Sequence, residues 1–70
     1  MRLSINGQER EFPELDSRPL LARLVELLGM KPDRIAIERN GDIIPRSTWE
    51  RVTLEGGDKL EVVQFVGGGR

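Results

Sequence analysis

The residues of this chain that could take part in chemistry lie at its C-terminal end. Gly67, Gly68 and Gly69 directly follow a β-forming run and precede Arg70, the last residue of the sequence. Because glycine has no Cβ atom, this segment can enter a channel that is too narrow for side chains. Four extended residues reach roughly 13 Å, so the tail could carry a carboxylate into another protein's active site. A frayed terminus or a linker remnant would explain the glycines more simply.

The composition argues against catalysis by the chain itself. Histidine, the usual general base at neutral pH, is absent, and so is cysteine. Disulfides, thiolate chemistry and thiolate metal sites are therefore excluded. We expect no catalytic residue, no bound metal or cofactor, and a role in catalysis only as a substrate or carrier.

The charge balance also narrows the possible partners. Eleven basic and twelve acidic residues give a net charge of −1, and only Phe12, Trp49 and Phe65 are aromatic. A nucleic-acid binder usually has a basic face, so we expect no nucleic-acid partner. We find no apolar run long enough for a membrane span and no signal peptide, and we therefore expect a cytoplasmic protein without a membrane partner.

The first half of the 70-residue chain predicts a hairpin followed by a helix. Residues 1–5 alternate between apolar and polar, Asn6-Gly7 favours a two-residue turn, and residues 8–12 return as a second strand that ends with Phe12 facing the core. After a connection over 13–18, the leucine-rich stripe of residues 20–28 predicts a helix.

The predicted helix has recognisable start and stop signals. Asp16 or Ser17 is expected to cap its N-terminus, and Pro19 suits its first turn. Gly29 is expected to end it in the left-handed conformation.

The second half predicts short strands joined by turns. Residues 35–39 alternate as a strand, Asn40-Gly41 forms a second turn, and the pair 43–44 follows. Residues 47–50 could form one helical turn capped by Ser47, and Trp49 is expected to close one end of the core. Val52 and Leu54 predict a further short strand or extended stretch.

The last predicted strand covers residues 59–66, after a tight turn at 55–58. Its nearly continuous apolar run favours a central position, buried on both faces or covered by a partner. Val63 and Phe65 alternate with Leu60 and Val62, so the two sets could face different sides. Val63, Phe65 and Val66 are therefore candidates for partner docking, and ordinary core packing is the equal alternative.

Together these elements indicate an α+β fold, with a mixed sheet wrapped around one helix. Residues 1–66 are expected to form the domain, and 67–70 a flexible glycine-rich tail. The order of elements resembles the β-grasp fold of ubiquitin-like proteins. Three stretches, residues 37–47, Trp49 and residues 56–63 with the terminal glycines, further resemble the ThiS family, the bacterial sulfur carriers of thiamine biosynthesis.

This resemblance implies a function for the tail. In the family, a ThiF-type enzyme uses ATP to adenylate the C-terminal glycine, here Gly69. A cysteine desulfurase indirectly supplies sulfur for a thiocarboxylate, which gives its sulfur to a ThiG-type thiazole synthase. The family pattern ends at glycine, so we expect Arg70 to be removed before activation; the alternatives are that Arg70 is an artificial addition or that the activating enzyme tolerates arginine. The small subunit of molybdopterin synthase, a ubiquitin-like tag and a plain interaction module remain alternatives.

Overall fold

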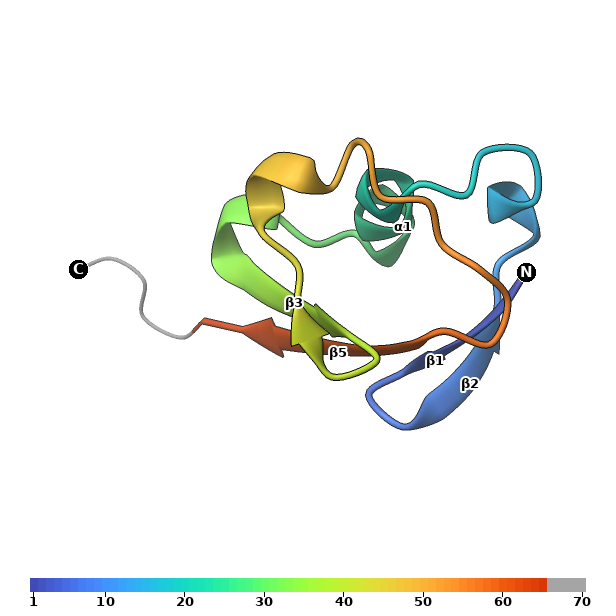
Figure 1. Ribbon diagram of the computed structural model, residues 1–70, viewed down its shortest axis with the longest axis horizontal. Coiled ribbons are helices and arrows are strands. Elements are labelled where there is room, and N and C mark those ends of the chain that lie inside the picture. The colour runs from blue at the N-terminus through green and yellow to red at the C-terminus, as the bar shows by residue number, and fades with distance from the viewer. Residues whose placement is uncertain (66–70) are drawn as a thin grey trace.

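A computed structural model describes residues 1–65 of the chain (Figure 1). Its principal elements are β1 (Arg2–Ile5), β2 (Gln8–Glu11), α1 (Leu21–Leu28), β3 (Ile35–Arg39), β4 (Asp42–Ile43) and β5 (Lys59–Gln64). Three single turns of 3-10 helix, Pro13–Leu15, Pro32–Arg34 and Arg46–Thr48, lie in the connections.

The five strands form one mixed sheet in the order β2-β1-β5-β3-β4. β5 is parallel to β1 and antiparallel to β3, while the outer pairs β1–β2 and β3–β4 are antiparallel. The prediction of a central last strand is therefore confirmed. Helix α1 lies on one side of the sheet, and we call the opposite side the outer face (Figure 1). This is the expected α+β arrangement of the β-grasp type.

Both predicted Asn-Gly turns are present. Asn6 and Gly7 have φ angles of 52° and 84°, and Asn40 and Gly41 have 51° and 94°. Two successive positive φ angles characterise the turn that matches the twist of a two-stranded hairpin, and asparagine and glycine tolerate them best. These residues therefore fix the registers of β1 with β2 and of β3 with β4.

The core lies between α1 and the inner face of the sheet. The buried side chains of α1 are Leu21, Leu24 and Val25, which confirms the leucine-rich stripe as core. The other members of the core are Leu3, Ile5, Phe12, Leu15, Ile35, Ile37, Trp49, Leu54, Leu60 and Val62. Leu15 is fully buried although its segment is predicted only as a connection.

Trp49 closes one end of the core, as expected. Its side chain is 4% exposed, and its indole Nε1–H donates to the carbonyl of Ile44 at 2.9 Å. The preceding turn begins at Arg46, and Pro45 occupies the capping position without a side-chain bond. The prediction that Ser47 caps this turn is therefore wrong, because Ser47 lies inside it.

The predicted start of α1 is also wrong. Leu20 precedes the helix in an extended conformation, and no side chain caps it. The N–H groups of Leu21 and Ala22 donate instead to the carbonyls of Val52 at 3.0 Å and Trp49 at 3.1 Å. Backbone from a distant segment thus replaces the capping side chain, and Pro19 lies outside the helix. The predicted end is confirmed, since Gly29 is left-handed with φ 72°.

Asp16, one of the two predicted caps, contacts the Met1 amino group instead. Its Oδ1 lies 2.6 Å from that nitrogen, and Oε2 of Glu11 lies 3.1 Å away. The hydrogen bond to Asp16, and then that to Glu11, raise the pKa of the amino group. The amino group in turn lowers the pKa of Glu11. Asp16 thus joins the segment after β2 to the start of β1.

Candidate functional site

Of the predicted docking residues, Val63 lies on the outer face of β5 and Phe65 follows the end of that strand. Val63 is 55% exposed and Phe65 is 51% exposed, whereas Leu60 and Val62 are buried on the inner face. The alternative that Val63 and Phe65 are ordinary core residues is therefore wrong, and so is burial of this strand on both faces. Covering by a partner stays a prediction. Val66, Gly67, Gly68, Gly69 and Arg70 lie outside the described residues.

On one side, β3 supports β5 along its whole length. The antiparallel register runs from Arg39 opposite Leu60 to Ile35 opposite Gln64. One further bond follows the strand, because the N–H of Phe65 donates to the carbonyl of Arg34 at 2.8 Å. The backbone is consequently fixed up to the last described residue before the predicted tail.

On the other side, β1 ends early and a side chain continues its ladder. Only Ser4 and Ile5 of β1 pair with β5. The side-chain amide of Asn6 then binds the backbone of Val62 twice: Oδ1 accepts from the Val62 N–H at 2.7 Å, and Nδ2 donates to its carbonyl at 3.1 Å. The sequence predicts Asn6 only as a turn residue, so this second role was missed.

The second Asn-Gly turn holds the start of β5 in a similar way. Oδ1 of Asn40 accepts from the N–H of Lys59 at 2.9 Å, and the Asn40 N–H donates to the Lys59 carbonyl at 2.8 Å. Both turns therefore fasten the central strand from opposite sides. No local signal indicated these bonds, because their partners are 19 and 56 residues away in the sequence.

A buried carboxylate completes this support. Asp58 is 7% exposed and lies 3.0 Å from both Nε and Nη2 of Arg39. It also accepts from the N–H of Glu55 at 2.9 Å and from Nδ2 of Asn40 at 3.3 Å. A buried charge is tolerated when it is paired and hydrogen-bonded, as it is here. The group acts as a structural anchor, and sequence reasoning placed Asp58 only in a turn.

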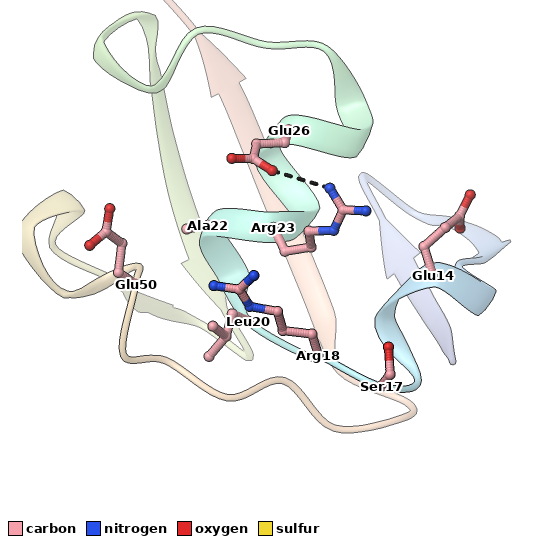
Figure 2. Close-up of a pocket in the computed structure, with 8 residues that line it drawn as sticks. All are labelled: Glu14, Ser17, Arg18, Leu20, Ala22, Arg23, Glu26 and Glu50. Carbon is pink, nitrogen blue, oxygen red and sulfur yellow. Dashed lines mark hydrogen bonds and ion pairs between the residues drawn. The ribbon is translucent and has the colours of Figure 1, made fainter.

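The helical side carries an open pocket of about 490 Å³ (Figure 2). It is lined by Glu14, Ser17, Arg18, Leu20, Ala22, Arg23, Glu26 and Glu50. The guanidinium of Arg23 is bonded to Glu26 at 3.2 Å, and Ser17 has no histidine to activate its hydroxyl, because the chain has none. The lining is a solvated set of mixed charges and does not form a nucleophilic site.

Neither a metal-binding cluster nor a membrane-spanning helix is found in residues 1–65. That part of the chain contains no group of three or more histidine, cysteine, aspartate or glutamate side chains arranged to hold a metal ion. Within the same residues, no helix has the length and apolar character needed to cross a membrane.

Comparison with known proteins identifies relatives along nearly the whole sequence. The model of the ThiS family matches residues 3–69. A thiazole synthase of Paramagnetospirillum magneticum is 42% identical over 69 residues, which are 99% of this chain and 20% of that protein. A thiazole synthase of Magnetococcus marinus is 34% identical over 70 residues, which are 100% of this chain and 21% of that protein. The chain therefore spans about a fifth of the length of these curated relatives.

The fold also matches a solved structure. The crystal structure of a thiamine biosynthesis protein (ThiS) from Geobacter metallireducens superposes with a TM-score of 0.78 and 26% identity. The match covers 99% of this chain and 100% of that one. Sequence and fold comparisons thus agree.

Proposed function

Because this chain belongs to the ThiS family, we propose that it is a sulfur carrier that serves thiamine biosynthesis and is not itself an enzyme. The observation that carries the proposal is the end of β5. Two exposed apolar residues lie close before the glycine segment: Val63 on β5, which is held by β1 and β3, and Phe65, which follows the strand. Such a strand offers a partner a firm surface to bind while the residues after it enter an active site.

The proposed chemistry takes place on the carboxylate of Gly69, after removal of Arg70. A ThiF-type partner brings ATP, and the carboxylate attacks its α-phosphorus, so that pyrophosphate leaves and an acyl-adenylate forms. A cysteine desulfurase supplies persulfide sulfur, which thiols reduce to sulfide while they are oxidised to a disulfide. The sulfide attacks the acyl carbon, AMP leaves, and a thiocarboxylate remains. Gly67 and Gly68 provide the Cβ-free path that these steps need.

The thiocarboxylate would donate its sulfur to a ThiG-type thiazole synthase. The relatives that carry this name contain a segment alignable with nearly all of this chain, which supports that partner. The family match over residues 3–69 favours this function over a molybdopterin synthase subunit or a protein tag. We place the reaction in the cytoplasm and assign the chain no bound cofactor, since ATP belongs to the activating partner.

The test is the intact mass of the carrier after incubation with a ThiF-type enzyme, ATP and a sulfide donor. A chain that ends at Gly69 should gain the mass difference of one sulfur replacing one oxygen. The matched Gly69→Ala variant should gain little, because a Cβ obstructs close backbone approach, while its circular dichroism stays unchanged. The same assay on the chain ending at Arg70 tests the need for removal. Equal conversion of all three forms would disprove the roles given to Gly69 and Arg70.

A further inference from the structure

Two glutamates oppose each other on the outer face of the sheet. Glu38 of β3 and Glu61 of β5 are direct partners in the antiparallel register. Both point away from α1, because they alternate with the buried Ile37 and Val62. Within residues 1–65, neither carboxylate takes part in an ion pair. Like charges directly opposite each other destabilise a sheet, so this pair costs the free domain stability.

Apolar side chains flank the two glutamates on the same face. Ile43, which is 70% exposed, is the register partner of Glu38 across β3 and β4. Next to the pair along the strands, Ala36 lies opposite Val63. Together with Phe65 these residues form what we call the outer patch: Ala36, Glu38, Ile43, Glu61, Val63 and Phe65. The outer patch therefore holds two opposed carboxylates beside the exposed apolar side chains of Ile43, Val63 and Phe65, and the exposed Lys59 borders it two residues before Glu61 on the same face of β5.

We propose that thiazole synthase binds the outer patch with a basic side chain, an arginine or a lysine, placed between Glu38 and Glu61. This inference rests on the proposed function, which supplies the partner. The charge of the patch selects the chemistry: a cation between the carboxylates removes their repulsion and gains charge-assisted hydrogen bonds. Burial of Ile43, Val63 and Phe65 around it excludes water, which strengthens that attraction.

The choice of thiazole synthase has a separate basis in the comparisons. In the two bacterial thiazole synthases, the matching segment covers 99% and 100% of this chain. A carrier-like segment in the same polypeptide keeps a contact surface close to the synthase at high effective concentration. In the outer patch, exposed apolar side chains lie beside two carboxylates that take part in no ion pair within residues 1–65.

The experiment is a calorimetric titration of the full chain into a purified thiazole synthase that has no carrier-like segment, at low and high salt. Glu38→Gln and Glu61→Gln should each raise Kd about tenfold, the usual loss when one charged hydrogen bond is removed. The double variant should also lose most of the salt dependence of Kd. Glu14→Gln is the matched control, because it removes the same charge from an exposed residue on the helical side. Its Kd should be unchanged.

Thermal unfolding separates binding from a structural role. Because the glutamates repel each other, Glu61→Gln should keep or raise the Tm of the free chain while it weakens binding. The proposal is overturned if the unmodified chain does not bind, or if the double variant binds as tightly as the unmodified chain. It is also overturned if Glu14→Gln weakens binding as much as the outer-patch variants do, or if the outer-patch variants that bind more weakly also have a lower Tm. The mass assay on the same proteins is independent: absence of a thiocarboxylate would disprove the proposed function, whereas its presence together with normal binding by the double variant would disprove only the outer-patch contact.

Discussion

The two faces of β5 differ sharply although they belong to the same six residues. On the inner face, Leu60 is 1% exposed and Val62 is 7% exposed. On the outer face, Val63 is 55% exposed and Glu61 is also exposed. A strand alternates its side chains strictly, so one sequence can hold the fold together on one face and offer a surface to a partner on the other.

The difference also separates stability from binding. Complete burial of a leucine or valine side chain stabilises a fold by about 1.5–3 kcal/mol, so the inner face contributes to folding. The exposed apolar residues of the outer face make no comparable contribution until a partner covers them. Substitutions on the inner side should therefore change stability, and those on the outer face should change binding.

The largest loss of stability is expected from Leu24→Ala. Leu24 is fully buried between α1 and the sheet, and removing a core leucine costs about 2–5 kcal/mol. Urea unfolding followed by circular dichroism measures the change. Leu27→Ala is the control in the same helix, since Leu27 is only partly buried and should lose less. Equal losses for the two variants would contradict the assignment of Leu24 to the centre of the core.

An intermediate loss is expected from Asn6→Gly. Glycine keeps the positive φ of the turn but removes both bonds to Val62, whose backbone groups are then left without a partner at a cost of about 1–3 kcal/mol. Amide hydrogen exchange at Val62 should become faster. Asn6→Asp retains the acceptor for the Val62 N–H and should lose less. Unchanged stability of the Asn6→Gly variant would mean that the turn alone, and not the amide, secures β5.

The smallest effect on stability is expected from Val63→Thr combined with Phe65→Thr. Threonine keeps the β-branched shape of Val63 and suits extended backbone at position 65, and substitutions at exposed positions usually change the free energy of unfolding by at most about 0.5 kcal/mol. Formation of the thiocarboxylate, or binding to thiazole synthase, should nevertheless fall. A marked drop in Tm would show that the outer face contributes to folding, and full activity would remove both residues from the docking surface.

Much of the candidate site could be predicted from local patterns. The alternation over residues 60–65 predicts that Leu60 and Val62 could face one side of the sheet and Val63 and Phe65 the other. The structure shows that the side of Leu60 and Val62 is the buried one. The choice between docking and core for Val63 could not be made from the sequence, because it depends on which face α1 covers. The opposition of Glu38 and Glu61 could not be predicted from the sequence either, because it depends on the register between β3 and β5, which are far apart in the chain.

The sequence by itself determined the features whose causes are local. Asn-Gly pairs adopt positive φ angles, Gly29 ends a helix, and a leucine stripe at helical spacing forms α1. Only the tertiary structure decided where α1 begins, because the carbonyls of Val52 and Trp49 accept its first N–H groups in place of Asp16 or Ser17. Backbone donors need any acceptor of suitable geometry, and a distant segment brought close by folding satisfies them as well as a neighbouring side chain does.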